Sequence, residues 1–488
     1  MTTAAAGATA DIAGVEVSTE HFIGGRRVGS RERFEVISPI GGDVIAEVAA
    51  GGPDEVDQAV RAARSAFPAW AALGTSGRAE ILHRLADLID ANVERLAIVE
   101  CTDMAMLLRS LRARVIKRGA LNYRAYADLA TAYEERDWRS RGTWNRVQRM
   151  PSGPAGVITP WNAPFMLSTW KTAPALAAGC TIVLKPAEWS PLACSLLADL
   201  AAEAGMPAGV FNVVQGTGEQ AGAALVEHPL LRRISFTGSP QTGRLIGEAG
   251  ARNLVPFTAE LGGKNPFVVF ADADLDAAAR KAAGQYDDSG QVCLAGTRLL
   301  VERRAHDEFL ERFRAAADEH VLGDPREEAT TISPMIHPLH VERVAGFVER
   351  ARADGHQILY GGNRLNGLFF EPTLIAPKSN EAEIVQREVF GPVLTFQTFS
   401  DEEEAVALAN STEYGLSAIV YTGSLGRADR VGRAIRSGTV WVNTFLIRDL
   451  TAPFGGIGIS GIGREGGDYA LDFYSDLKTL QILDESVR

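Results

Sequence analysis

Short apolar segments alternate with helix-like segments along this chain, and this alternation limits its fold more than any other feature. Four segments between residues 153 and 239, GPAGVITPW, TIVLKP, FNVVQG and RRISFTGS, have the length and apolar content of buried strands. Helical patterns follow three of them, as in SPLACSLLADLAAEAG (190–205). Strands and helices that alternate in this way form a parallel sheet covered by helices, so we expect an α/β fold.

Two further patterns define the organisation of the chain. A second strand–helix series begins near residue 265 and continues to about residue 445, and ELGGK (260–264) separates the two series. We therefore place a domain boundary near residues 261–263. RDWRSRGTWNRVQRMP (136–151) predicts a protruding hairpin, and DLKTLQIL (476–483) predicts a strand. Earlier in the chain, the apolar spacing of residues 78–100 predicts one helix, capped by Thr75 or Ser76.

Charge and cysteine content restrict the partners and the compartment. The chain has 488 residues, with 49 Lys and Arg against 61 Asp and Glu, a net charge of −12. Such an acidic surface repels nucleic acid and anionic membranes, so we expect neither as a partner. The four cysteines form no CxxC pair, and the N-terminus lacks the features of a secretory signal. No apolar run is long enough for a membrane span, so we expect a cytoplasmic protein.

Cys293, Glu260 and Asn162 are the residues best suited to catalysis. Cys293 lies among small residues in SGQVCLAGTR, Glu260 beside two glycines in TAELGGKNP, and Asn162 between prolines in ITPWNAPF. A thiol can act as nucleophile, a carboxylate as base, and a fixed amide as donor to an oxyanion. Each also has an ordinary alternative when taken alone: an inert buried cysteine, an ion-paired glutamate and a turn asparagine.

Two strand ends carry residues suited to a nucleotide. FTGSPQTG (236–243) places Gly238 and Gly243 between a strand and a helix, where backbone N–H groups can meet a phosphate. Lys185 and Glu188, in LKPAEWSP, follow another strand and are able to bond ribose hydroxyls. Taken alone, each segment is also an ordinary strand–helix turn.

Metal and serine chemistry have little support. His337 and His340 form HPLH, but Pro338 disfavours a regular helix interior and no acidic residue is adjacent, so we expect no metal site. The chain contains no G-x-S-x-G nucleophile elbow.

Seven motifs, taken in their order, resemble the aldehyde dehydrogenase superfamily. They are PWNAPF, LKPAEWSP, FTGS, ELGGKNP, GQVC, EVFGPV and PFGG. The resemblance extends from about His21 to Ile482. It implies a Rossmann-type cofactor domain (1–135 and 152–261), an α/β catalytic domain (262–470) and a β oligomerisation arm (136–151 and 471–488). It also implies a homodimer or a homotetramer.

The resemblance implies a role for each matching residue. Cys293 attacks the aldehyde carbon, Asn162 and the Cys293 N–H hold the oxyanion, Glu260 activates water, and Glu465 in GREGG takes part in proton relay. Retention of Glu260 favours hydrolysis over transfer to coenzyme A, and Glu188 favours NAD over NADP. The cofactor-binding residues that it implies are Ile158, Thr159, Pro160, Trp161, Lys185, Glu188, Gly218, Phe236, Gly238, Ser239, Leu261, Glu388 and Phe390.

A narrower resemblance concerns the substrate. The stretch from VNTFLIRDL to DFYSDLK is similar to dehydrogenases of ring-cleavage semialdehydes, among them 2-hydroxymuconate, 2-aminomuconate and 5-carboxymethyl-2-hydroxymuconate semialdehydes. Two arginines of that group are associated with the substrate carboxylate, and Arg118 and Arg448 match them. A guanidinium is well shaped for a carboxylate. The alternative is that both are surface arginines and that the substrate is an uncharged aromatic or aliphatic aldehyde, in a biosynthetic role.

The chain departs from the family at two places. CTDMAMLL (101–108) stands where DTGKP is usual, in a segment that often borders the substrate entrance. DDSGQVC stands where Asn-x-Gly-Gln is common, so Asp287 and Asp288 add negative charge that would raise the pKa of Cys293 if it points inward. A binding protein that kept the fold and lost catalysis is a third reading, which the intact set of Cys293, Glu260 and Asn162 opposes.

Overall fold

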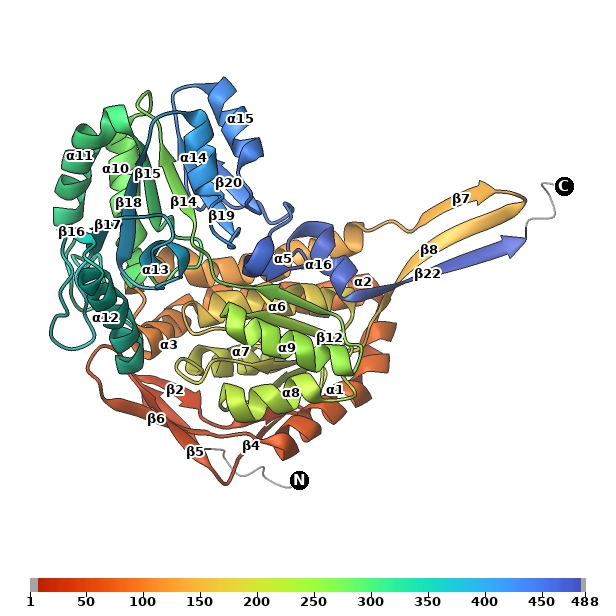
Figure 1. Ribbon diagram of the computed structural model, residues 1–488. Coiled ribbons are helices and arrows are strands. Elements are labelled where there is room, and N and C mark those ends of the chain that lie inside the picture. Colours follow the sequence, from red (N-terminus) through yellow and green to blue (C-terminus); the bar gives the residue numbers. More distant parts are fainter. Residues whose placement is uncertain (1–7, 484–488) are drawn as a thin grey trace.

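The computed structural model describes residues 8–483, and its largest sheet has eight strands (Figure 1). Five parallel strands form the centre of this first sheet, in the order β13 (Phe257–Glu260), β12 (Arg233–Thr237), β9 (Pro154–Ile158), β10 (Thr181–Lys185) and β11 (Phe211–Val213). Antiparallel strands β21 (Gly461–Ile462), β3 (His21–Ile23) and β4 (Arg26–Val28) extend its two sides. The expected α/β fold with a parallel sheet is confirmed.

The sequence explains why these strands are central. Every residue of β9 and β10 is buried, as expected for strands covered on both faces. The helices around this sheet are α1 (Pro53–Ala72), α2 (Gly74–Ala91), α3 (Val93–Met104), α5 (Ile116–Ala132), α6 (Pro164–Ala178), α7 (Leu192–Glu203), α8 (Ala223–Glu227), α9 (Pro240–Arg252) and α16 (Gly467–Phe473).

The single helix expected over residues 78–100 is wrong. Asn92 separates α2 from α3 and has non-helical backbone angles. Its side-chain amide donates to the carbonyl of Leu88 at 2.8 Å, so a side chain replaces part of the helical hydrogen bonding. The residue that precedes α2 is Leu73, so Thr75 and Ser76 lie inside the helix instead of capping it.

The second sheet has seven strands and occupies the upper left of Figure 1. Its order is β16 (Gln357–Tyr360), β17 (Thr373–Ala376), β18 (Val393–Phe399), β15 (Arg298–Glu302), β14 (Pro266–Val269), β19 (Ser417–Tyr421) and β20 (Thr439–Val442), and only β16 is antiparallel to its neighbour. Its helices are α10 (Leu275–Ala283), α11 (His306–Asp318), α12 (Pro338–Ala353), α13 (Glu383–Gln386), α14 (Glu402–Ala409) and α15 (Leu425–Ala434).

A three-stranded antiparallel arm projects from the body of the molecule (Figure 1). It consists of β7 (Arg136–Ser140), β8 (Thr143–Pro151) and β22 (Ser475–Leu483), with β8 in the middle. The hairpin and the C-terminal strand expected from the sequence are confirmed. The last residues assigned to this arm, 484–488, lie outside the described residues.

The two sheets and the arm do not coincide with the domain bounds that the resemblance implies, which are 262–470 for the catalytic domain and 471–488 for the second part of the arm. Strand β21 belongs to the first sheet although it lies within 262–470, and α16 extends to Phe473, beyond the expected start of the arm. The division into domains therefore stays a prediction. Among residues 8–483, no helix combines the length and the apolar character needed to cross a membrane.

Candidate active site

The carboxyl ends of the parallel strands gather the expected cofactor residues at one edge of the first sheet. Strand β9 lies between β10 and β12, so the chain leaves β9 toward one side and returns to the other. Open α/β sheets bind ligands at such a switch point. Ile158 ends β9 and Thr159 follows it, Lys185 ends β10, and Glu260 ends β13.

Lys185 and Glu188 form an ion pair at this edge. The Nζ atom of Lys185 lies 2.9 Å from Oε2 of Glu188. Burial lowers the pKa of Lys185. Burial acts in the opposite sense on Glu188, but Lys185 and the backbone N–H of Gly218 outweigh it and leave the pKa of Glu188 below its ordinary value. The carboxylate of Glu188 is half-exposed beside Gly218, so it is accessible to a hydroxyl donor of a ligand.

The FTGS segment joins β12 to the N-terminus of α9. Ser239 is the N-cap residue, and its hydroxyl accepts a hydrogen bond of 3.2 Å from the N–H of Thr242. The N–H of Gly238 donates to the carbonyl of Glu260 at 3.1 Å. The buried hydroxyl of Thr237 has no hydrogen-bond partner among the described residues. A helix N-terminus with a free hydroxyl beside it fits a phosphate.

The remaining expected cofactor residues surround this edge. Ile158, Thr159, Phe236 and Leu261 are buried, whereas Pro160 and Trp161 are half-buried. The hydroxyl of Thr159 lies 3.0 Å from that of Ser168. Together with the ion pair and the α9 terminus, these residues fit a dinucleotide that has an adenosine ribose, phosphates and a second ribose.

Asn265 holds the segment that carries Cys293. Its amide nitrogen donates to the carbonyls of Cys293 at 2.7 Å and Ala295 at 2.9 Å, and its oxygen accepts the N–H of Ser417 at 3.0 Å. From the opposite side, the amide of Asn162 donates to the carbonyl of Gln291 at 2.9 Å. Asn162 therefore lies beside the nucleophile segment, and this bond uses one of the two N–H groups of its amide.

The thiol of Cys293 is half-buried and protonated in this state. Burial raises its pKa to about 12, the charges of Glu388 and Glu260 contribute to this rise, and Arg448 opposes it. Asp287, by contrast, is exposed. Asp288 is half-buried, and the charges that act on Cys293 are those of Glu388, Glu260 and Arg448. The effect expected of Asp287 and Asp288 is therefore not the source of this rise.

Glu260 is a buried carboxylate without a hydrogen-bond partner among the described residues. Burial raises its pKa well above the ordinary range, and the charge of Glu465 adds to this effect. Glu465 is itself held by the indole Nε1 of Trp170 and by Nζ of Lys171, each at 2.5 Å. One carboxylate is thus fixed and paired, while the other is unpaired and able to exchange a proton.

Close approaches explain the glycines of ELGGK and PFGG. A Cβ atom on Gly262 would lie 2.0 Å from a carboxylate oxygen of Glu388, and one on Gly263 would lie 2.6 Å from the carbonyl of Cys293. The N–H of Gly263 donates to Glu388 at 2.8 Å. A Cβ on Gly455 would lie 2.8 Å from Glu260. Glycine lets these backbones approach the carboxylates and the nucleophile segment.

Arg118 and Arg448 both lie over the ring of Trp170. Their guanidinium carbons are 5.7 Å and 5.2 Å from its centroid. Arg118 donates to Oδ1 of Asn122 at 3.0 Å. Within residues 8–483, neither guanidinium pairs with a carboxylate at ion-pair distance. Burial lowers the pKa of Arg118 to about 10, and the neighbouring charge of Arg448 adds to this effect.

Comparison with known proteins identifies the family to which this geometry belongs. The family model described as "Aldehyde dehydrogenase family" matches residues 27–480. The chain belongs to this family. The expected enzyme class, an NAD-dependent aldehyde dehydrogenase, is confirmed.

Relatives of this aldehyde dehydrogenase match it over nearly their whole length. It is 43% identical to the 2-hydroxymuconic semialdehyde dehydrogenase of Pseudomonas sp. (strain CF600), over 94% of this chain and 98% of the relative. It is 38% identical to the 5-carboxymethyl-2-hydroxymuconate semialdehyde dehydrogenase of Escherichia coli, over 92% and 98%. The solved structure of P. syringae AldA indole-3-acetaldehyde dehydrogenase, a mutant in complex with NAD+ and IAA, has 36% identity and a TM-score of 0.95, over 97% and 98%.

Sequence reasoning missed three residues of the aldehyde dehydrogenase site. Asn265 lies in ELGGKNP, a motif that was recognised without a role for its asparagine. Trp170 and Lys171 lie in α6, where Lys171 is the only charged residue of a mostly buried helix and so indicates a buried partner. Their roles depend on hydrogen bonds to residues far away in the chain, 294 and 295 positions apart for the bonds to Glu465.

Residues 101–108 of the aldehyde dehydrogenase are buried except for Thr102. Oδ2 of Asp103 accepts the N–H of Leu192 at 2.8 Å, at the start of α7. Burial raises the pKa of Asp103 well above its ordinary value, and the backbone N–H groups at this helix N-terminus oppose the rise. This departure from the family therefore places its side chains, except that of Thr102, in the interior.

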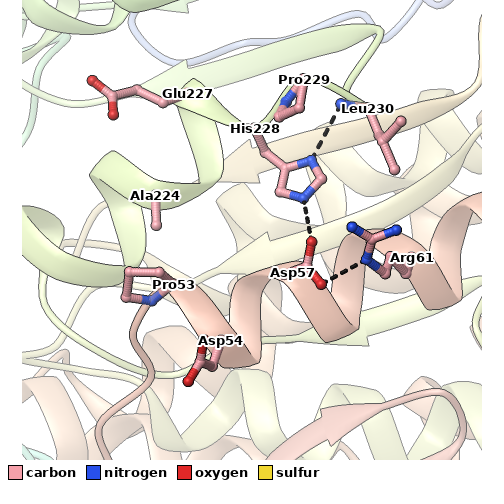
Figure 2. A pocket seen from close by; sticks show the side chains of 9 residues that line it. All are labelled: Pro53, Asp54, Asp57, Arg61, Ala224, Glu227, His228, Pro229 and Leu230. Carbon is pink, nitrogen blue, oxygen red and sulfur yellow. Dashed lines mark hydrogen bonds and ion pairs between the residues drawn. The ribbon is translucent and has the colours of Figure 1, made fainter.

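A separate pocket of about 570 Å³ lies between α1 and α8 (Figure 2). Its polar groups bond to one another: Nε2 of His228 lies 3.2 Å from Asp57, which accepts from Nε of Arg61 at 2.6 Å. Nδ1 of His228 accepts the N–H of Leu230 at 3.2 Å. None of its lining residues is among the expected site residues of the aldehyde dehydrogenase.

Proposed function

We propose that this aldehyde dehydrogenase oxidises a carboxylated, unsaturated semialdehyde of the muconate type, and that Arg118 and Arg448 bind the carboxylate of the substrate. The observation that carries the proposal is the pair of guanidinium groups over Trp170, without a carboxylate of the described chain between them. The two cations repel each other, and burial disfavours both charges. A substrate carboxylate would remove this repulsion and satisfy their N–H groups.

The arginine pair also lies near the residues that surround Cys293, the thiol that would attack the aldehyde carbon. Trp170, which supports both guanidinium groups, donates to Glu465, whose charge acts on Glu260. The charge of Arg448 acts on Cys293. One end of the substrate would therefore be held by the arginines while its aldehyde meets the thiol. The names of the relatives, two of which are semialdehyde dehydrogenases of this kind, support the same substrate class.

The covalent steps use residues of this chain. The Cys293 thiol gives its proton to Glu260 in its ionised form, directly or through water, and the sulfur bonds to the aldehyde carbon. The aldehyde oxygen becomes an alkoxide that the amide of Asn162 and the N–H of Cys293 stabilise. Bound NAD supplies the hydride acceptor. Departure of the hydride leaves a thioester on Cys293. Glu260 takes a proton from a water molecule, whose oxygen adds to the thioester carbon. The carbon–sulfur bond then breaks, the Cys293 sulfur takes the proton back from Glu260, and a carboxylic acid leaves.

Burial and the charge of Glu465 raise the pKa of Glu260, so Glu260 has to give up its proton before it acts as a base, and we propose that the proton leaves toward Glu465, which pairs with Lys171. Glu260 has no hydrogen-bond partner among the described residues, so it is free to alternate between water and the thioester. Glu465 keeps its position through Trp170 and Lys171. We assign Glu260 the role of base and Glu465 that of its neighbour in proton relay.

The cofactor residues fit NAD better than NADP. Lys185 and Glu188 would hold the adenosine ribose, Gly238 and Ser239 the pyrophosphate, and Glu388 with Phe390 the nicotinamide half. The ionised carboxylate of Glu188 would repel a 2′-phosphate. Glu188→Ser should therefore lower the ratio of kcat/KM with NAD to that with NADP.

The arm suggests how copies of the chain associate. Trp138, Leu477 and Ile482 are exposed on it, and β7 and β22 each leave one edge unpaired within the described chain. We propose that the arm pairs with another subunit, in a homodimer or a homotetramer. The four cysteines of the chain, none of which lies in the arm, are free, and this supports a cytoplasmic location.

Exchange of the two arginines tests the substrate class. Arg118→Ala and Arg448→Ala should each lower kcat/KM for a carboxylated dienal about tenfold to hundredfold, the effect of losing charge-assisted hydrogen bonds. Oxidation of benzaldehyde should change less than threefold. Arg114→Ala, an exposed arginine one turn before Arg118, is the matched control. Equal losses for both aldehydes, or none, would instead support an uncharged substrate.

A further inference from the structure

Helix α12 makes three hydrogen bonds to three consecutive carbonyl groups of the EVFGPV segment. Nε2 of His340 lies 2.7 Å from the carbonyl oxygen of Phe390. Arg343 donates to the carbonyl of Glu388 at 2.8 Å and also to that of Val389. His340 and Arg343 are three positions apart, so they share one face of the helix. HPLH, set aside as a metal motif, thus contains a residue with a defined partner.

The protonation of His340 follows from its surroundings. The ring is buried, and burial lowers its pKa to about 4, so the imidazole is neutral and carries one proton. A carbonyl oxygen only accepts hydrogen bonds, which places this proton on Nε2. His340 is therefore a fixed donor to Phe390 at neutral pH.

We call these three hydrogen bonds from His340 and Arg343 the clamp. The main chain that the clamp holds has a conformation that needs support. Phe390 has a φ of 60°, in the left-handed region that non-glycine residues rarely adopt. Gly391 continues the contact with α12, because a Cβ there would lie 2.6 Å from a methyl carbon of Val344. The hydrogen bonds from α12 oppose the return of Phe390 to a relaxed backbone.

The same imidazole also contacts the cofactor edge of the first sheet. Its ring lies 5.1 Å from Trp161 and 6.0 Å from the ring of Phe390, and Trp161 lies 5.3 Å from Phe390. Trp161 precedes Asn162, which bonds to the nucleophile segment. His340 thus connects the main chain at Phe390 with the residue next to Asn162.

We propose that His340 and Arg343 are positioning residues that fix the main chain of residues 388–390 and so hold Glu388 and Phe390 against the nicotinamide half of the cofactor. The inference rests on the cofactor roles assigned above to Glu388 and Phe390. It extends them, because neither His340 nor Arg343 has to touch the reacting atoms. Both act through the backbone.

Cofactor binding in the absence of substrate tests this proposal. We would measure the affinities of the full-length enzyme for NADH and for ADP, which lacks the nicotinamide and its ribose, together with the emission of bound NADH. His340→Leu and Arg343→Ala should weaken NADH about threefold to tenfold, as for the loss of one or two hydrogen bonds, and should shift the NADH emission. ADP binding should stay within twofold.

Conservative and neighbouring variants separate positioning from folding. His340→Gln keeps an N–H donor and should recover most of the NADH affinity. Leu339→Ala, an exposed neighbour on α12, should leave both affinities unchanged. Arg343 is at the surface, so its variant reports on the clamp even if His340→Leu does not fold.

Two results would overturn the proposal in distinguishable ways. If His340→Leu and Arg343→Ala leave NADH binding unchanged, or weaken NADH and ADP equally, while Glu388→Ala weakens NADH alone, the clamp is wrong and the role of Glu388 stands. If Glu388→Ala has no selective effect on NADH, the cofactor role of the segment fails, and the clamp fails with it.

Discussion

The indole Nε1 of Trp170 donates a 2.5 Å hydrogen bond to Oε2 of Glu465. This bond joins the arginine pair, which lies on the ring of Trp170, to the two carboxylates near the nucleophile. Hydrogen bonds to charged groups are stronger than neutral ones, especially in the interior. Substrate anchoring and proton transfer therefore share one side chain.

Trp170→Phe removes the donor and keeps an aromatic ring below the arginines. We expect kcat to fall about tenfold with little change in KM, because Glu465 loses one of its two short hydrogen bonds. The free energy of unfolding should fall by about 1.5–3 kcal/mol. Steady-state kinetics and denaturation followed by circular dichroism measure the two effects.

Trp70→Phe is the matched control for this prediction. Nε1 of Trp70 donates to a neutral carbonyl, that of Leu176, at 3.2 Å. We expect a smaller loss of stability and an unchanged kcat. Equal effects of both substitutions on kcat would show that the bond to Glu465 has no special part in the reaction.

Glu260→Gln should separate the two half-reactions. Without the base, the first turnover should release about one NADH per active site and leave a thioester on Cys293, while kcat falls about a hundredfold. A rapid-mixing burst at the NADH absorbance and the mass of the acyl-enzyme measure this outcome. Full steady-state turnover in this variant would exclude Glu260 as the base.

The raised pKa of Glu260 also predicts how stability depends on pH. The folded chain holds the Glu260 proton more tightly than the unfolded chain, whose pKa is near 4.5. The Glu260 carboxyl therefore adds most to the free energy of unfolding below that pH. This stabilisation is lost as the pH rises through the folded-state pKa. Glu260→Gln does not titrate, so its Tm should rise relative to that of the unchanged enzyme between pH 5 and pH 9. A constant difference in Tm over this range would contradict the shift.

Glu388→Gln should make Cys293 more reactive in the cofactor-free enzyme. Apart from burial, the carboxylate of Glu388 is the main cause that raises the thiol pKa to about 12. A fall of one pKa unit increases the thiolate about tenfold, so alkylation by iodoacetamide at pH 8 should accelerate about threefold to tenfold. Glu203→Gln, at the exposed end of α7, should leave the rate unchanged. A slower reaction in Glu388→Gln would contradict the inference that the Glu388 carboxylate raises the pKa of Cys293.

Gly262→Ala should damage the nicotinamide side of the cofactor site. Its Cβ would lie 2.0 Å from Oε2 of Glu388, so the carboxylate has to move. We expect kcat/KM for NAD to fall about tenfold or more. Gly222→Ala, whose Cβ would meet nothing nearer than 3.9 Å, should stay within twofold. Similar losses in both variants would point to a general effect on the fold.

The sequence allowed prediction of the elements that depend on local pattern. The strands β9, β10, β11 and β12 are recognisable because each is a short apolar run beside a helix. The break at Asn92 is not recognisable in the sequence, because it depends on the hydrogen bond that its side-chain amide donates to the carbonyl of Leu88. Strand β21 has only two residues and exists because β13 offers it an edge, so no periodicity reveals it.

The candidate site divides in the same way. Cys293, Glu260 and Asn162 stand in recognisable motifs, and the structure brings their segments together. Asn265 and Trp170 were missed because their importance lies in partners that are distant in sequence. The sequence indicates that nearby negative charge raises the pKa of Cys293, but it points to Asp287 and Asp288 as the residues responsible. In the structure the charge that raises this pKa belongs to Glu388 and Glu260, which are distant in sequence, whereas the adjacent Asp287 is exposed.

The two-residue strand β21 has a consequence for the order in which the protein is made. It borders β13, and the N–H of Leu261 donates to the carbonyl of Ser460 at 2.9 Å. The cofactor sheet thus lacks its last strand until about 200 further residues have left the ribosome, although N-terminal regions otherwise fold first. During this interval the edge that carries Glu260 stays open, and a nascent chain of this kind is a natural client for a chaperone.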